Sequence, residues 1–399
     1  MKDNLEIYVH IPFCVRKCKY CDFLSFPAGD KEQRQYVQAL LQEIRYYGPM
    51  MRDRRVSTIY FGGGTPSWLD AKLLILILEE LKKQFMVNTD AEISMECNPG
   101  TITEDNMRGY HLAGINRLSI GLQSTDDEEL KLLGRIHTYQ QFLKTYELAR
   151  NAGFTNINVD LMSGLPYQTT ERYMKSLSRV IRLKPEHISA YSLIIEKGTP
   201  FYDTYKFDVV KQQAGMETEM LPNEDEVYRI CQLTREMLGA AGYERYEISN
   251  YARKGHVCRH NMGYWERENY LGLGLGAASL LDEVRYQNVT DFYTYIENAE
   301  HISTKELSNV LGTSLHESGE LLSKQAAMEE FMFLGLRKTS GISRVEFERC
   351  FGVSLESVYR EPLEELKEEG LITVGQGRVA LTREGLDVSN YAMAKFLLE

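Results

Sequence analysis

Six short β-like runs alternate with amphipathic helical stretches between residues 5 and 195, and this alternation restricts the possible folds more than any other feature. The expected strands cover residues 5–11, 56–61, 91–97, 117–122, 156–162 and 187–193. The expected helices cover residues 31–47, 71–84, 104–112, 139–152 and 170–183. Strands that alternate with helices are joined in parallel by right-handed crossovers, so the pattern predicts an α/β fold, either a barrel or a doubly wound sheet.

Glycine and polar residues are concentrated in the loops that follow these strands. The loops are Gly62-Gly63-Gly64-Thr65-Pro66, Glu96 through Gly100, Gln123-Ser124 and Asp160 through Pro166. In parallel α/β barrels the chemistry is placed at the carboxyl ends of the strands. The loops therefore favour a barrel with one functional mouth.

Three of the seven cysteines, Cys14, Cys18 and Cys21, form a Cys-x3-Cys-x2-Cys pattern directly after the first strand. In a reducing compartment such a cluster is expected to bind metal rather than to form disulfides. Three thiolates can hold three corners of a [4Fe-4S] cubane and leave the fourth iron open. An open iron can bind the amino and carboxylate groups of S-adenosylmethionine (SAM), whose sulfonium accepts an electron and yields a 5′-deoxyadenosyl radical.

Zinc is the competing interpretation of these cysteines. A structural zinc site needs four ligands, and only His10 or Cys97 could supply the fourth. The glycine triplet at Gly62 to Gly64 favours SAM instead, because its backbone groups can come close to an amino-acid ligand. Taken alone, such a triplet is usually a tight turn.

The charge balance and the apolar segments restrict partners and location. Lys and Arg total 46 against 57 Asp and Glu, giving a formal charge of -11, so nucleic acid is not an expected partner. The N-terminus lacks the apolar run of a signal peptide. The longest apolar stretch, residues 73–78, is far below the roughly 20 residues that cross a bilayer. A cytoplasmic protein is expected.

The pattern changes after residue 200. An inserted loop is expected over residues 206–225, a helix over 224–241 and an extended segment over 243–251. The Gly-rich run at residues 270–278 is read as tight backbone packing rather than as a nucleotide fingerprint, since no clear strand precedes it. From residue 301 a helical unit ends in a β-hairpin at Gly375-Gln376-Gly377, which looks like a small winged helix. Its acidic run at 361–369 favours packing or partner docking over DNA binding.

Several of these motifs together resemble one known family. The segment Tyr8 to Cys14, the cysteine triplet, Gly-Gly-Gly-Thr-Pro and Asp160 to Pro166 are similar to the oxygen-independent coproporphyrinogen III oxidase-like (HemN-like) branch of radical SAM proteins. The resemblance implies a partial TIM-type (β/α)6 barrel core over residues 1–200. It further implies a barrel extension with a heme-motif segment over 201–300 and a helical, winged-helix-like domain with a β-hairpin over 301–399.

Within this branch the chain departs from the true dehydrogenase in two places. Phe23 stands where the dehydrogenase has a fourth cysteine, and only seven residues precede Tyr8. Both features, and the motif His260-Asn-Met-Gly-Tyr-Trp265, resemble the HemW-type heme chaperones. The resemblance implies heme binding and delivery to respiratory proteins at the membrane. Coproporphyrinogen III dehydrogenation is the alternative; tRNA methylthiolation is remote, because the acidic chain shows no RNA-binding module.

The same resemblance implies roles for individual residues. Tyr8, Gly63 and Glu96 would contact the SAM on the cluster. An adjoining or second SAM position would be lined by Gly64, Thr65, Gln123, Arg135 and Asp160. His260 is either the heme ligand or a hydrogen-bonding residue at a domain interface. A reduced flavodoxin or ferredoxin is the expected electron donor.

Overall fold

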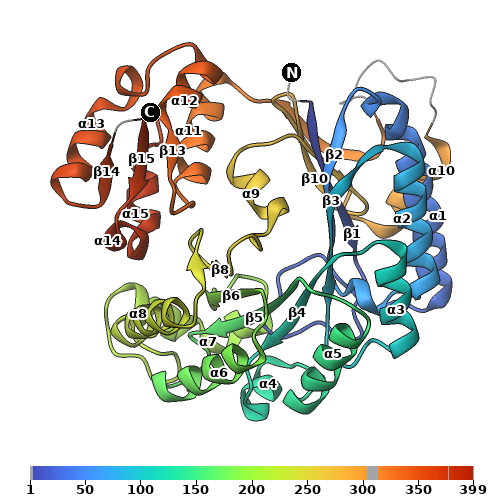
Figure 1. The fold of residues 1–399 in the computed structure, drawn as a ribbon, viewed down its shortest axis with the longest axis horizontal. Coiled ribbons are helices and arrows are strands. Elements are labelled where there is room, and N and C mark those ends of the chain that lie inside the picture. Colours follow the sequence, from blue (N-terminus) through green and yellow to red (C-terminus); the bar gives the residue numbers. More distant parts are fainter. Residues whose placement is uncertain (1–2, 303–312, 376, 399) are drawn as a thin grey trace.

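The computed structural model describes residues 3–302, 313–375 and 377–398 and contains a large sheet wrapped into an open barrel (Figure 1). The core of the sheet consists of β1 (Asn4–Ile11), β2 (Arg55–Gly63), β3 (Met86–Cys97), β4 (Arg117–Gln123), β5 (Ile157–Ser163) and β6 (His187–Ser192). These six strands pair in chain order and all in parallel. The predicted α/β fold with a parallel barrel is confirmed.

Helices cover the outer face of the parallel strands (Figure 1). They are α1 (Asp30–Tyr47), α2 (Ala71–Gln84), α3 (Glu104–Ala113), α4 (Asp127–Leu133), α5 (Tyr139–Asn151) and α6 (Thr170–Leu183). Five of them match the expected helices within a few residues. Helix α4 was not predicted, because its seven residues are too few for a clear helical period.

The two faces of the barrel strands carry different side chains. On β1, Leu5, Ile7, Val9 and Ile11 are fully buried in the hydrophobic core. The alternate positions of the strands face the barrel interior and are largely polar; they include Tyr60, Glu96, Ser119, Asn158, Asp160 and Ser189, all of which line a cavity. A polar interior in a small barrel leaves room and hydrogen-bonding groups for a ligand.

Four further strands extend the sheet beyond β1. They are β9 (Tyr270–Leu273), β10 (Ala278–Leu281), β11 (Val284–Asn288) and β12 (His316–Leu321). The Gly-rich run therefore contains a strand of its own, β9, which pairs in parallel with β1. The expected tight packing is found, since a Cβ at Gly272 would overlap the carbonyl oxygen of Ala278.

The segment after β6 is more helical than expected. Helix α7 (Pro200–Gln213) occupies the first part of the expected loop at 206–225, so the loop assignment is wrong for residues 206–213, while residues 214–223 form a loop as expected. Thr199 caps this helix and Pro200 stands in its first turn, while its mixed polar surface hides any helical period in the sequence. Helix α8 (Glu224–Ala240) follows as expected, and the expected extended segment forms the short strands β7 (Glu244–Arg245) and β8 (Asn250–Ala252).

A smaller unit follows at the C-terminus (Figure 1). Helices α11 (Lys324–Gly335), α12 (Arg344–Phe351) and α13 (Leu355–Glu368) pack with α14 (Arg383–Asp387), α15 (Ser389–Ala394) and a three-stranded sheet. That sheet contains β13 (Ile342–Ser343), β14 (Ile372–Val374) and β15 (Arg378–Leu381), and β14 and β15 form the expected hairpin. Gln376, at the expected turn, lies outside the described residues.

The junction between the two units contains further elements. Helix α10 (Phe292–His301) and strand β12 flank the expected boundary at residue 301, and β12 still pairs with β11 of the large sheet. Helix α9 (Arg259–Trp265) lies between the barrel and the C-terminal unit (Figure 1). None of the described helices combines the length and apolar character that a transmembrane span requires.

Candidate functional site

The three motif cysteines lie in the loop after β1 and line one cavity of about 380 Å³ inside the barrel. Cys14 is buried and Cys18 and Cys21 are partly exposed. Among the described residues, no three His, Cys, Asp or Glu side chains converge as ligands of a single metal ion. A cubane takes one thiolate at each of three separate irons, so thiols spread around one cavity suit it.

A chain of polar contacts links the cysteines to three neighbouring loops. The Cys14 Sγ lies 3.3 Å from the Thr65 Oγ1, which accepts a hydrogen bond of 2.7 Å from the Asn98 Nδ2. The Arg135 guanidinium donates to the Asn98 Oδ1 at 2.5 Å and approaches the Cys18 Sγ at 3.7 Å. The loops after β1, β2 and β3 and the turn after α4 are thereby held in one arrangement at the mouth.

The glycine loop packs backbone to backbone against the cysteine loop. The Gly64 N–H donates to the Ile11 carbonyl and the Thr65 N–H to the Phe13 carbonyl, both at 2.8 Å. A Cβ at Gly64 would lie 2.7 Å from the Phe13 carbonyl oxygen, closer than van der Waals contact permits. Gly63 has a φ of 110° and packs against the His10 ring. Only glycine allows this approach, so the triplet does more than make a turn.

Glu96 lies at the end of β3 with its carboxylate in the cavity. It accepts a hydrogen bond of 3.1 Å from the Tyr60 hydroxyl. Burial, with the nearby Asp160 carboxylate as a second cause, raises its pKa to about 7. A carboxylate whose proton is lost near neutral pH responds strongly to any cationic or hydrogen-bonding ligand placed beside it.

Tyr8, on β1, lies behind Tyr60, a residue that lines the cavity. Its hydroxyl lies 3.1 Å from the His10 Nδ1, and its ring stacks on Tyr60 with centroids 6.3 Å apart. It is not among the residues that line the cavity in the described structure. Its contact with the cavity therefore passes through Tyr60.

Gln123 and Asp160 line the other side of the cavity. Gln123 has a φ of 70° at a register shift between β4 and β5, and its Oε1 accepts a hydrogen bond of 2.9 Å from the Tyr191 hydroxyl. Asp160 accepts hydrogen bonds from Asn158 at 2.7 Å and Ser119 at 3.2 Å, and burial raises its pKa. Strained backbone at a cavity wall is typical of residues positioned for function.

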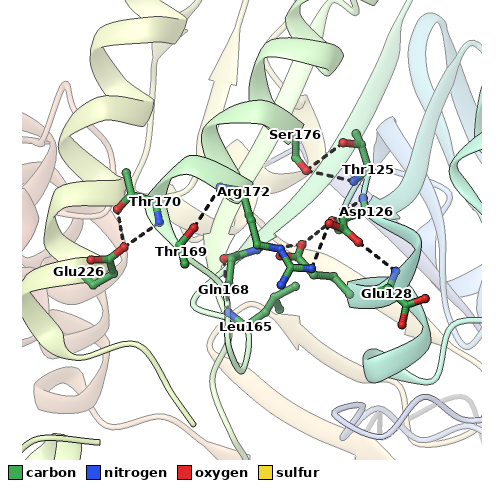
Figure 2. Close-up of polar contacts among 12 residues, drawn as sticks. Thr125, Asp126, Glu128, Leu165, Gln168, Thr169, Thr170, Arg172, Ser176 and Glu226 are labelled. Carbon is green, nitrogen blue, oxygen red and sulfur yellow. Dashed lines mark hydrogen bonds and ion pairs between the residues drawn. The ribbon is translucent and has the colours of Figure 1, made fainter. Parts of the chain in front are cut away.

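A polar network behind the barrel wall supports the loop that follows Gln123 (Figure 2). Arg172 on α6 pairs with Asp126 at 3.0 Å and with the buried Glu129 at 3.3 Å. Glu129 also accepts a hydrogen bond of 2.5 Å from the Ser124 hydroxyl. Residues 124–129 are therefore tied to α6, and this contact fixes the direction in which the chain leaves β4.

His260 is buried on α9 rather than exposed in the cavity. Its Nδ1 lies 2.7 Å from the Thr58 Oγ1 and its Nε2 lies 3.0 Å from the Tyr264 hydroxyl, so both ring nitrogens have partners. Only 1% of the residue is exposed, and burial lowers its pKa to about 3. This geometry matches the hydrogen-bonding role left open by the sequence and offers no free nitrogen to a heme iron.

Most of the site residues predicted from the sequence line the cavity, and some residues that line it were not predicted. The cysteines, Gly63, Gly64, Thr65, Glu96, Gln123, Arg135 and Asp160 all line the cavity. Asn98, Arg117 and Tyr191 also line it and were not predicted. Arg117 could have been found from its inward position on β4, two residues before Ser119, by the two-residue period of a strand.

The sequence matches two protein-family models. Residues 8–180 match the radical SAM superfamily, and residues 322–388 match the HemN C-terminal domain. A solved structure, coproporphyrinogen III oxidase (HemN) from Escherichia coli, superposes with a TM-score of 0.82 at 24% identity, covering 99% of this chain and 90% of the other. That likeness concerns the fold. Barrel, cysteine loop and family match together define a radical SAM protein.

Curated relatives narrow the assignment. The heme chaperone HemW of Lactococcus lactis is 34% identical over 98% of this chain and 97% of its own length. HemW of Bacillus subtilis is 34% identical over 98% and 99%, and HemW of Escherichia coli is 35% identical over 99% and 98%. The chain belongs to the HemW family.

The radical SAM superfamily implies a [4Fe-4S] cluster and SAM for this chain. The site fits both groups on its own chemistry. Three thiols line the cavity for the cluster, and Gly63 and Gly64 bring backbone groups to the cavity wall beside them, within reach of an amino-acid ligand. Buried carboxylates at Glu96 and Asp160 can accept hydrogen bonds from ammonium or hydroxyl groups.

Proposed function

We propose that this protein is a heme chaperone that binds heme and delivers it to respiratory-chain proteins. The observation that carries the proposal is the identity of 34–35% with relatives named heme chaperone HemW over nearly the whole length of both chains. Agreement over the full length includes the barrel and the C-terminal unit. A shared barrel alone would support only a shared superfamily.

In this proposal Cys14, Cys18 and Cys21 hold the [4Fe-4S] cluster at the cavity mouth. Gly63 and Glu96 position the SAM at the cluster, and Tyr8 supports this position through its stacking on Tyr60. Gly64, Thr65, Gln123, Arg135 and Asp160 shape the adjoining part of the cavity. When bound, the cluster supplies one electron to the sulfonium of SAM. The residues that line the cavity orient the ligand and exclude water. Glu96 carries a proton below a pH of about 7.

Two features support a chaperone over coproporphyrinogen III dehydrogenase. The fourth cysteine expected of the dehydrogenase is replaced by Phe23, whose side chain is 69% exposed. Other exposed apolar residues lie in loops at the same end of the barrel; they are Val15, Ile136, Tyr167 and Ile194. An apolar rim at the mouth suits a planar, apolar macrocycle or the protein that receives it.

Three further assignments belong to the same proposal. A reduced flavodoxin or ferredoxin supplies the electron to the cluster. Heme is handed to respiratory proteins at the membrane, whereas the chaperone itself remains in the cytoplasm. His260 is the heme ligand only if heme binding releases it from Thr58 and Tyr264, since both ring nitrogens are occupied.

The test is a hemin titration of anaerobically reconstituted protein, followed by absorption, together with a coproporphyrinogen III assay. We expect about one heme per chain and no loss of propionate carbons. Phe23→Ser should weaken heme binding, whereas Tyr293→Ser, at a position that is 72% exposed on α10, should leave it unchanged. Absence of heme uptake, or decarboxylation of coproporphyrinogen, would contradict the proposal.

A further inference from the structure

Arg117 is a buried cation that forms no ion pair with any described residue. It begins β4, is only 2% exposed and lines the barrel cavity. Its Nε is wholly buried and has no hydrogen-bond partner, and no carboxylate among the described residues lies within ion-pair distance of its guanidinium. A guanidinium remains charged under all ordinary conditions, so this charge cannot be relieved by loss of a proton.

The groups around Arg117 favour its charge without forming an ion pair with it, and they raise its pKa in spite of burial. Cys258, Glu92, Tyr60 and Tyr246 are its main electrostatic neighbours. Burial raises the pKa of Cys258 to about 12 and raises that of Tyr246 as well, so this thiol and this phenol are neutral. The Glu92 carboxylate favours the charged guanidinium from beyond ion-pair distance, while its two oxygens accept hydrogen bonds from the backbone N–H groups of Arg259 and His260.

The two histidines that interact electrostatically with Arg117 are neutral. Burial lowers the pKa of His260 to about 3 and holds that of His187 well below its ordinary range, with Arg117 as a second cause for each. Asp160, the other carboxylate of the cavity near β4, accepts hydrogen bonds from Asn158 and Ser119. Arg117 therefore has carboxylates in its neighbourhood, Glu92 and Asp160, but no direct ion-pair partner among the described residues, and it lines the cavity.

A buried guanidinium whose Nε has no hydrogen-bond partner can make charge-assisted hydrogen bonds to an anionic ligand in the cavity. We propose that Arg117 is the anchoring residue for the carboxylate group of a ligand held inside the barrel. The planar fork of the guanidinium matches a carboxylate in a bidentate geometry. No other residue that lines the cavity is a cation on this part of the wall, since Arg16, Lys17 and Arg135 lie on the loops at the mouth.

A second orphaned group lines the same cavity. Asn250 on β8 is buried, and its Oδ1 has no hydrogen-bond partner. The register pairs Asn250 with Ser189 on β6, so both side chains face the interior. A ligand whose carboxylate pairs with Arg117 and whose donor group reaches Asn250 would satisfy both buried groups. Because the open iron takes the carboxylate of the SAM on the cluster, the two sources of such a carboxylate are a SAM in the adjoining position and the propionate of a heme.

The test compares acid and neutral forms of each ligand on the reconstituted protein. The two pairs are SAM with decarboxylated SAM, and hemin with hemin dimethyl ester. For the pair whose carboxylate Arg117 binds, we expect the wild type to prefer the acid form by about 10- to 100-fold and Arg117→Met to lose that preference. Arg108→Met, at an exposed position on α3, is the matched control and should keep it.

The two ligand pairs separate the possible failures. If hemin does not bind at all, the proposed function fails while the SAM pair still tests Arg117. If both acid forms keep their full preference in Arg117→Met, or if chloride protects the wild type from thermal unfolding as well as the acid ligands do, the anchoring role is contradicted. Without ligand, Arg117→Met should melt close to the wild type, because no ion pair within 4.0 Å among the described residues is lost; a large drop would make Arg117 structural instead.

Discussion

The Cys14 Sγ lies 3.3 Å from the Thr65 Oγ1, although helix α1 and strand β2 separate the two residues along the chain. This contact joins the cysteine loop to the glycine loop. Thr65 in turn binds Asn98, which binds Arg135. The mouth of the barrel is therefore one connected polar structure, and a change in one loop should be felt in the others.

Replacing a motif cysteine should remove the cluster. Cys21→Ser removes one of three thiolates on one loop, and the remaining two cannot hold a cubane with the same stability. We expect iron content and the brown absorbance of the reconstituted protein to fall severely. Cys231→Ser, at an exposed cysteine on α8, should retain both, and equal losses in the two variants would contradict the assignment.

A methyl group at Gly64 should separate the cysteine and glycine loops. Because the new Cβ would lie 2.7 Å from the Phe13 carbonyl oxygen, backbone must move, and we expect a loss of about 1–3 kcal/mol in the free energy of unfolding together with weaker SAM binding. The control is Gly239→Ala in α8, where no atom lies within 4 Å of the added Cβ. That change should be neutral or stabilise by about 0.5–1 kcal/mol.

Glu96 should make the ligand-free protein less stable as pH rises. Its pKa is about 7 in the folded protein and about 4.5 when unperturbed, so the folded state retains a proton that the unfolded state releases between these values. Stability contributed by that proton, roughly 3 kcal/mol, is lost as pH rises from 4.5 to 7. Glu43 has a similarly raised pKa, so the measurement is the difference between wild type and Glu96→Gln in chemical denaturation.

SAM affinity should change in the opposite direction. The ionised carboxylate of Glu96 is the better hydrogen-bond acceptor, so affinity should rise as pH increases through about 7. In Glu96→Gln the affinity should be lower and nearly independent of pH over this range. A pH dependence that survives the substitution would assign the titration to another group.

The network behind the barrel wall should contribute to stability through Glu129. Arg172→Met leaves the buried Glu129 carboxylate without its cation, and we expect a loss of about 1–3 kcal/mol, reduced because Arg172 is itself partly exposed (Figure 2). Arg108→Met breaks an exposed pair with Glu104 and should cost about 0.5 kcal/mol or less. Equal unfolding free energies for the two variants would contradict this role of Glu129.

The sequence predicts the barrel well because its strands and helices are long enough to show their periods. The cysteine loop is also local, since three ligands within eight residues need no tertiary information. Helix α7 and strand β12 were missed because the first has a mixed surface and the second is an exposed strand with few apolar residues. Short or weakly patterned elements are decided by their neighbours.

The same is true of the site: residues at strand ends can be predicted from the sequence, whereas contacts between distant loops cannot. Gln123 and Asp160 were expected at the mouth because each ends a predicted strand. Asn98 binds Thr65 and Arg135 only through the folded arrangement of three loops. The motif around His260 resembles a family segment but does not predict the orientation of the imidazole ring, which is fixed by hydrogen bonds to Thr58 on β2 and to Tyr264.

The central claim is that three thiolates hold a cluster whose open iron faces a SAM cavity. The most direct measurement is electron paramagnetic resonance of the anaerobically reconstituted, dithionite-reduced protein with and without SAM. The account predicts a [4Fe-4S]+ signal whose g values shift when SAM is added, and the loss of this signal in Cys21→Ser. A protein without the signal, or a signal that SAM leaves unchanged, would contradict it.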